Sequence, residues 1–415
     1  MQAFGGQTLL KNGGVYYSPQ IPDGYLYNND VVPSITGKSE LTRVTPATGN
    51  SSGPGQLIRF QLPNNGFADM RYAVLLLTAS ASQTGGTFCR FSQLINTMIK
   101  KIRITAGAKE ICDVNDYNLI CSWIFWSFIS QETVTNIGPL LGYDTTTNRN
   151  TNAAGREYLV PLFLDCLTSK PWPLKLMDDI LTVELTLDTA VNCLEFDGTS
   201  PTFSVTNIEW QIPIFEPNQS YLDAIGPSLC WKFANITCVK QSLTAASGDL
   251  QISEKTSCLN HIVALQRVAA NTTGGANLDK FLTWTYSNNT SYQVRHKGHY
   301  HPPQPVDCTT VAVGAWYHFL NSISSWSFFN ATGNNTGFSQ TTPTLFTSTR
   351  FQMHVNLEVF PHSALISGSD VVGSTDNIVF NITLSATPGS ALEVDFLCIS
   401  DYLICLNNGK LSITR

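Results

Sequence analysis

One order of segments occurs twice along the chain, and this repetition limits the possible folds more than any other feature. In each copy, strand-like segments lead to a turn at a glycine, and a helix-like segment follows. Aligning IRITAGAKEICDVNDYNLIC with YQVRHKGHYHPPQPVDCTTVAVGAWYHF places Gly107 opposite Gly298, about 190 residues apart. Any two β-sandwiches share many short strands and glycine turns, so the single helix after the same hairpin is the feature that favours a duplication. We therefore expect two similar domains within the 415 residues.

The first copy is predicted from its hydrophobic periodicity. LIRFQLP alternates from Leu57 onwards, MRYAVLLLTASAS is a continuous apolar run, and a hairpin surrounds Gly107. DVNDYNLICSWIFWSFI predicts a helix with Asp113 as its N-cap, because Trp123 and Trp126 lie on one helical face. A loop rich in Thr and Asn (142–155) follows, and the strand-like YLVPLFL, ILTVELTLDTA and FSVTNIEWQIPIF complete the domain.

The second copy has the same kinds of segment in the same order. Strand-like stretches lead to the turn at Gly298, the helix-like VAVGAWYHFLNSI follows, and an Asn/Thr/Gly loop (328–342) precedes three more strand-like stretches. The predicted fold is therefore all-β, with two tandem β-sandwiches that each carry a short helix. The expected domains are an N-terminal arm with loops at 1–55, a first sandwich at 56–222 and a second at 223–415.

The composition argues against nucleic acid as a direct ligand. Lys and Arg number 24 against 30 Asp and Glu, which gives a net charge of -6, and no basic run is longer than Lys100 and Lys101. The first residues show no basic segment followed by an apolar one, and no window has the 18 or more apolar residues of a membrane span. We expect a soluble, unexported chain.

The eleven cysteines lie between Cys89 and Cys405 and form no Cys-x-x-Cys pair. Their odd number and their positions within apolar segments favour buried free thiols over a disulfide framework or a zinc site.

Two groups of side chains invite a test for chemistry. His296, His299 and His301 are the only dense histidine group, but prolines follow and no Cys or carboxylate is near, so an exposed edge strand is expected instead of a metal site. Three carboxylates, at Asp178, Asp179 and Glu184, lie beside a turn, where a structural role is expected over acid and base catalysis.

Motifs of nucleophilic elbows, phosphate-binding loops and zinc proteases are also missing from the sequence. We therefore predict that the protein is not an enzyme and has no catalytic, cofactor-binding or metal-binding residues.

Four stretches resemble one known family: KIRITAGAKEICDVNDYNLI, the block from YLVPLFL to LTLDTA, SYQVRHKGHYHPPQPV, and the segment from ISGSD to the end. The chain is similar over about residues 56–415 to the double-jelly-roll major capsid proteins of adenoviruses, virophages, polinton-like viruses, tailless membrane-containing phages and large DNA viruses. None of the four is a strict signature.

This resemblance implies a double jelly roll and a structural role in the virion of a DNA virus. Chains of this family form homotrimers that act as pseudo-hexameric capsomers of an icosahedral capsid. The implied partners are neighbouring capsomers, penton and minor capsid proteins, and an internal membrane beneath the shell. The implied places of synthesis and assembly are the host cytoplasm or nucleus.

A second interpretation remains open from the residues themselves. A two-domain carbohydrate-binding or receptor-binding β-sandwich protein would also be rich in aromatic residues (11%) and poor in charged ones (13%). Trp123, Trp126, Trp316 and Phe319 lie on the two predicted helices, where most should be core and a minority should contact neighbouring subunits. The rival interpretation predicts a monomer with a sugar-stacking groove.

Overall fold

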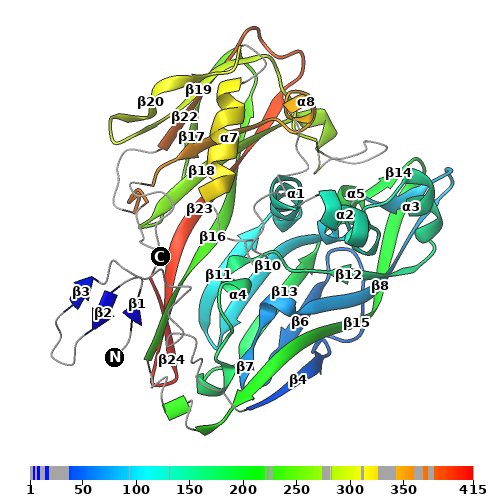
Figure 1. Cartoon of the computed structure of the whole chain (residues 1–415). Coiled ribbons are helices and arrows are strands. Elements are labelled where there is room, and N and C mark those ends of the chain that lie inside the picture. The colour runs from blue at the N-terminus through cyan, green and yellow to red at the C-terminus, as the bar shows by residue number, and fades with distance from the viewer. Residues whose placement is uncertain are drawn as a thin grey trace.

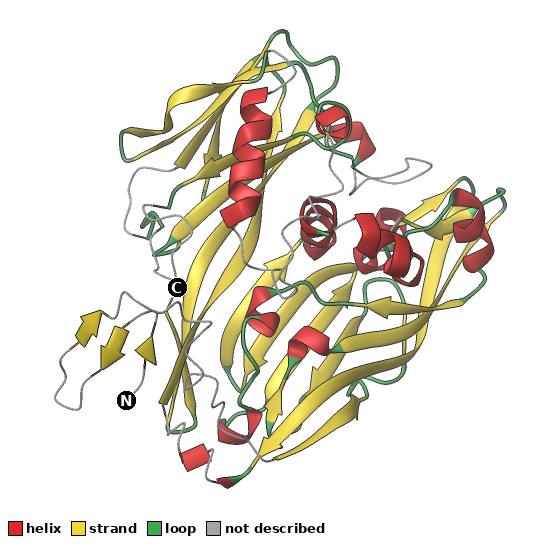
Figure 2. Cartoon of the chain, in the orientation of Figure 1, coloured by secondary structure: helices red, strands yellow, loops and turns green. Residues whose placement is uncertain are grey.

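A computed structural model shows a chain built mainly from antiparallel strands (Figure 2). It describes residues 3–4, 7–9, 15–17, 37–92, 94–129, 131–219, 222–223, 228–272, 281, 283–309, 313–325, 343–358, 368–372 and 378–414. The predicted loop at 328–342 lies outside the described residues.

Two antiparallel sheets form the first sandwich (Figure 1). Sheet 1A has the order β12 (Arg156–Val160), β8 (Val74–Thr84), β15 (Thr199–Pro217) and β4 (Gly37–Val44), and the short strands β5 (Ser51–Ser52) and β7 (Phe67–Ala68) also pair with β15. Sheet 1B has the order β11 (Lys109–Asn115), β10 (Ile99–Ala106), β13 (Leu181–Leu187) and β6 (Leu57–Gln61).

The second sandwich repeats this arrangement strand for strand. Sheet 2A has the order β21 (Gln352–Asn356), β18 (Leu259–Val268), β23 (Leu392–Asn407) and β16 (Ser228–Leu243), with β24 (Lys410–Thr414) paired to β23. Sheet 2B has the order β20 (His299–Asp307), β19 (Asn289–His296), β22 (Ile378–Leu384) and β17 (Ser247–Ile252). The strands at corresponding positions follow one another in the same order along the chain in both halves. The predicted fold of two tandem sandwiches is therefore confirmed.

The two turn glycines occupy matching places. Gly107 connects β10 to β11 with a φ of +57°, and Gly298 connects β19 to β20 with a φ of +78°. Glycine adopts such values more readily than any residue with a side chain. At Gly107 the neighbour also excludes a side chain, because an added Cβ would lie 2.6 Å from Asp179 Oδ1. The predicted equivalence of the two hairpins is confirmed.

A helix follows each hairpin, namely α1 (Tyr117–Phe128) and α7 (Val313–Ser325). The prediction that Asp113 caps the first helix is wrong. Asp113 continues β11, where it pairs with Arg103 and accepts a 2.8 Å hydrogen bond from Lys101 Nζ. The N-cap is Asp116, whose left-handed backbone (φ 53°) ends the strand. Ladder pairing with β10 therefore prevailed over the local capping preference.

The remaining elements are short. The helices are α2 (Gln131–Ile137), α3 (Thr146–Asn152), α4 (Asp165–Thr168), α5 (Ala190–Cys193) and α8 (Pro343–Phe346), and the 3-10 turns are η3 (Met70–Tyr72), η4 (Ile95–Met98), η5 (Gly138–Leu141), η6 (Leu174–Leu176) and η7 (Ala269–Asn271). Part of the predicted loop at 142–155 is thus helical, because the Thr145 hydroxyl accepts from the Asn148 N–H and caps α3.

Within the expected N-terminal arm and loops at 1–55, Gly37–Val44 and Ser51–Ser52 are instead strands of the first sandwich. β4 pairs with β15 along its whole length, from Gly37 opposite Pro217 to Val44 opposite Trp210, so the first sandwich begins before residue 56. Most side chains of β4 are exposed because it is an edge strand, and its sequence therefore shows no apolar alternation. Nearer the N-terminus, β1 (Ala3–Phe4), β2 (Gln7–Leu9) and β3 (Val15–Tyr17) form a small separate sheet.

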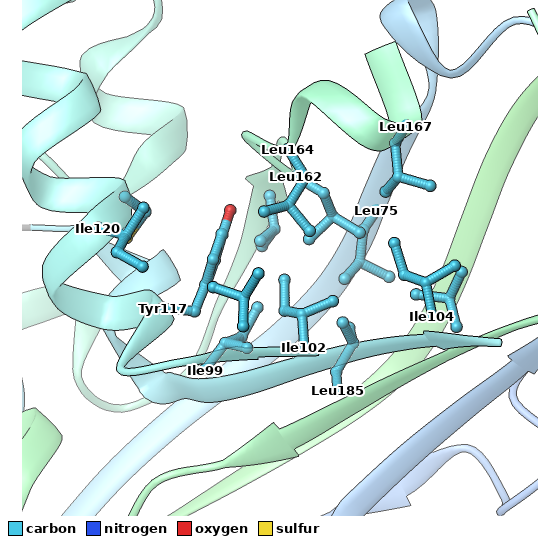
Figure 3. Close-up of a cluster of buried hydrophobic side chains, with 14 of the residues drawn as sticks. Leu75, Ile99, Ile102, Ile104, Tyr117, Ile120, Leu162, Leu164, Leu167 and Leu185 are labelled. Atoms are coloured by element: carbon cyan, nitrogen blue, oxygen red, sulfur yellow. The ribbon is translucent and has the colours of Figure 1, made fainter. Parts of the chain in front are cut away.

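The core of the first sandwich lies between its two sheets (Figure 3). Ile102 and Ile104 of β10 and Leu185 of β13 meet Leu75 of β8, and each is at most 1% exposed. Burying each such side chain contributes about 1.5–3 kcal/mol. Tyr117 of α1 also lies in this core, where its hydroxyl accepts a 2.9 Å hydrogen bond from the Phe163 N–H.

One buried ion cluster fixes the short ribbon of β9 (Cys89–Phe91) and β14 (Leu194–Phe196) to α3. Glu195 is fully buried and lies 2.7 Å from Arg90 Nε and 3.1 Å from Arg149 Nη1. Asn150 accepts a further bond from Arg90 at 2.7 Å. Such a cluster is costly to break, because removal of the carboxylate leaves two cations buried.

Candidate functional site

The three histidines singled out from the sequence lie around one hairpin end. His296 of β19 pairs directly with His299 of β20 across the turn, and Val294 of β19 pairs with His301 of β20. β20 is an edge strand of sheet 2B. His299 is exposed and His296 is buried. Among the described residues, no group of three His, Cys, Asp or Glu side chains is arranged to hold a metal ion.

The three carboxylates have separate structural surroundings. Glu184 on β13 lies 2.7 Å from Arg59 on β6, so it forms a cross-strand ion pair. Asp179 lies beneath Gly107, and the Asp178 N–H donates to the Gly409 carbonyl at 2.9 Å. Glu184 therefore belongs to a strand pair, and Asp178 and Asp179 belong to turns. No two of these three carboxylates are placed across a cleft.

The cysteines are nearly all free and buried, as expected from the sequence, with one pair as the exception. Nine are free, and eight of those are buried. Burial raises the pKa of the Cys308 thiol to about 12 and that of Cys89 to about 11, so these thiols are poor nucleophiles at neutral pH. Cys230 and Cys405 form a disulfide between directly paired positions of β16 and β23, which the sequence did not predict.

No helix within the described ranges has both the length and the apolar character needed to cross a membrane.

An apolar contact joins the two sandwiches to each other. The outer face of sheet 2A carries Val263, Leu265, Leu397 and Ile399, each at most 2% exposed, and these side chains belong to the apolar cluster of the first sandwich. β18 is therefore buried on both faces, which explains its continuous apolar sequence. α1 lies between the two sandwiches at this contact (Figure 1).

Two tryptophans of α1 provide the polar part of the contact. Trp123 Nε1 donates to Gln352 Oε1 at 2.8 Å, and the Arg350 guanidinium lies 3.8 Å from the ring centre of Trp126. His354 Nε2 is 2.9 Å from the same amide oxygen. Because burial lowers the pKa of His354 well below its usual value, the ring is neutral, and because an amide oxygen only accepts, Nε2 carries the proton.

Charged groups close the margins of this contact. Asp116 accepts from Lys240 Nζ of β16 at 2.8 Å. Asp165 of α4 accepts the backbone N–H of Ala234 at 2.7 Å, which satisfies a donor on the free edge of β16. Burial and the nearby Asp401 raise the pKa of Asp165 to about 7, while Lys232 opposes the rise.

The aromatic residues predicted on the helices are mostly core, as expected. Trp123 and Trp126 lie in the contact between the sandwiches, Phe319 lies in the second core, and Trp316 packs against that core. The most exposed aromatic side chain of α7 is instead Tyr317. Sequence reasoning missed the partners on β21, because no local pattern marks a residue whose contact lies more than 200 positions away in the chain.

Comparison with solved structures gives matches over nearly the whole chain. The Faustovirus major capsid protein has a TM-score of 0.67 and 10% identity, over 92% of this chain and 92% of that chain. VP54 of PBCV-1 has a TM-score of 0.61 and 13% identity, over 92% and 97%. The mavirus major capsid protein has a TM-score of 0.51 and 11% identity, over 96% and 95%.

No protein-family model and no curated protein sequence matches the chain. At such low identities the likeness shows the fold. The chain has the double jelly-roll fold of these viral capsid proteins.

Proposed function

We propose that the chain is a viral major capsid protein, a structural subunit of an icosahedral shell and not an enzyme. The observation that carries this proposal is the fold, whose strand order is the same in both halves of this chain and whose likeness to the compared capsid proteins extends over nearly their full length. Fold alone does not determine function, so the proposal also needs an assembly argument from this chain.

The proposed mechanism is the assembly of homotrimers. Three chains with two sandwiches each make a ring of six similar units, so a threefold oligomer presents a nearly sixfold outline and packs as a pseudo-hexameric capsomer. The low charged fraction of 13% supports this, because flanks that pack closely would otherwise bury like charges or lose hydration. We place the boundary between the units at 222/223, with β4 added to the first unit.

Further partners rest on the sequence resemblance alone. They are neighbouring capsomers, penton and minor capsid proteins, and an internal membrane beneath the shell. The corresponding location is the virion, after synthesis in the host cytoplasm or assembly in the nucleus.

The rival function, binding of a carbohydrate or a receptor, needs exposed aromatic rings in a groove. Trp123, Trp172, Trp210 and Trp284 are each at most 2% exposed, so none of the four can stack on a sugar. The burial of these four tryptophans counts against the rival, whereas Tyr72, Tyr300 and Tyr317 are exposed on the separate elements η3, β20 and α7.

Native mass measurement at micromolar concentration separates the two functions. The capsid proposal predicts a particle with three times the mass of one chain, held by interfaces above roughly 2,000 Å² that involve both halves. A stable monomer that forms no trimer on addition of salt or divalent ions would contradict it and favour the rival.

A further inference from the structure

The duplication allows each surface of one sandwich to be compared with its counterpart in the other. The two helices differ most. Every residue of α1 from Tyr117 to Ser127 is buried, because the helix lies between the first core and the second sandwich. α7 packs on β20 and β21 of its own sandwich, but Val313 and Tyr317, one turn apart, are 62% and 64% exposed.

The outer faces of sheets 1A and 2A also differ in exposure, but here the exposed face belongs to the first sandwich. The outer face of sheet 2A is covered by the first sandwich. The outer face of sheet 1A is open: Leu41, opposite Pro213, is 56% exposed, and Leu76 and Leu159 are partly exposed. One sandwich thus has a covered helix and an open sheet, and the other has an open helix and a covered sheet.

The residues of sheet 2A that contact α1 also have counterparts on sheet 1A. On the edge strand β21, Gln352 and His354 point outward and contact Trp123. On the matching edge strand β12, Tyr158 and Val160 point into the core, so Glu157 and Leu159 point outward. Since β12 pairs with β8 as β21 pairs with β18, Glu157 and Leu159 occupy the corresponding sites.

We propose that the two open surfaces are the two halves of one contact between chains. The exposed face of α7 in one chain packs on the outer face of sheet 1A in the next, in the way that α1 packs on sheet 2A within a chain. This inference rests on the proposed trimer and specifies which surfaces hold it together. Because the contact joins two different surfaces, it is heterologous, and in the proposed trimer three copies of it close the ring.

The chemistry of the open sheet suits a helix that carries Val313 and Tyr317. One ion pair on this face is already formed, with Arg43 3.6 Å from Glu209, and Gln211 donates to the same carboxylate at 2.7 Å. Glu157 on the edge strand β12 is exposed, so the covering chain must supply a donor to it or leave it in water. Most of the sheet's other outward residues are small or apolar, so a helix can approach closely.

The first test changes the helix. Tyr317→Asp should weaken the trimer at least tenfold in native mass titrations, because a carboxylate would be buried against an apolar surface. Tyr317→Phe keeps the ring and should form trimers like the parent. Tyr317 is mostly exposed in the single chain, so neither change should lower the melting temperature of the monomer. Full trimerisation of the Asp variant would overturn the proposed contact.

The second test changes the sheet and mixes the variants. Leu159→Arg should also give monomers, and Thr78→Arg on the adjacent strand replaces it if the first variant does not fold. A mixture of the Tyr317 and Leu159 variants should give dimers only, because a single pair of intact surfaces can meet. An isologous contact, in which both chains use the same surface, would give no such dimers in the mixture.

The outcomes also separate this contact from the proposed function. A parent protein that never trimerises contradicts the function itself. A trimeric parent whose helix and sheet variants both remain trimeric contradicts only the contact.

Discussion

The buried hydrogen bond between Trp123 and Gln352 offers the sharpest energetic test of how the two sandwiches are joined. Trp123→Phe removes the 2.8 Å bond to Gln352 Oε1 but leaves that oxygen the bond from His354 Nε2. We expect a cost of about 2–3 kcal/mol, from about 1 kcal/mol for the bond and the rest for lost packing. Gln352→Leu should cost at least as much, because it removes the acceptor of both the indole N–H and His354 Nε2.

The double variant should recover part of this cost, because neither partner is then left alone. We expect a coupling free energy of about 1–2 kcal/mol in urea unfolding at fixed protein concentration. Trp172→Phe serves as a matched control, since its Nε1 donates to the Cys166 carbonyl within the first sandwich. That change should be additive with Gln352→Leu. Additivity within about 0.3–0.5 kcal/mol for Trp123 as well would refute the proposed bond.

Three further predictions follow from buried groups. Burial raises the pKa of Asp165 from 3.8 to about 7, so the stabilising contribution of this carboxyl group is full below pH 3.8 and is lost as the pH rises to 7. Asp165→Asn should remove this dependence and raise the urea midpoint at pH 8, by less than the roughly 4 kcal/mol of a fully buried group, and an unchanged pH profile would contradict the assignment. Maleimide labelling of the denatured, unreduced protein should modify nine of eleven cysteines, and reduction should release Cys230 and Cys405; eleven reactive thiols before reduction would rule out the pair. Glu195→Gln should lower the free energy of unfolding in urea by about 3–5 kcal/mol, because it breaks the buried ion cluster. Glu184→Gln, in a partly exposed ion pair, should cost about 1 kcal/mol or less, and equal costs would contradict the buried cluster.

The sequence predicted best where the signal is local and periodic. The turn at Gly107 and the helix after it are visible because alternating isoleucines flank a residue that accepts a positive φ. β4 escaped prediction because an exposed edge strand has no apolar alternation. Asp113 was assigned to a cap because capping preferences are local, whereas its place in β11 depends on pairing with β10.

Contacts between residues that lie far apart in the chain were harder to predict from the sequence. Trp123 was expected on a helix, but its partner Gln352 is identified only once the two sandwiches are placed together. The pair Cys230 and Cys405 is separated by 175 residues, and only the register of β16 and β23 brings it together. Similarly, Trp316 was one of four helix aromatics of which a minority was expected to contact neighbours, but it packs against the second core. Tyr317, which was not singled out, is exposed instead.

Electron microscopy of the purified native protein tests the central claim most directly, because class averages report both the number of sandwiches and their symmetry. The account predicts closed particles with six lobes of density around a threefold axis, in which within-chain and between-chain contacts alternate. Two-lobed particles at every concentration, or closed particles with another number of lobes, would contradict it.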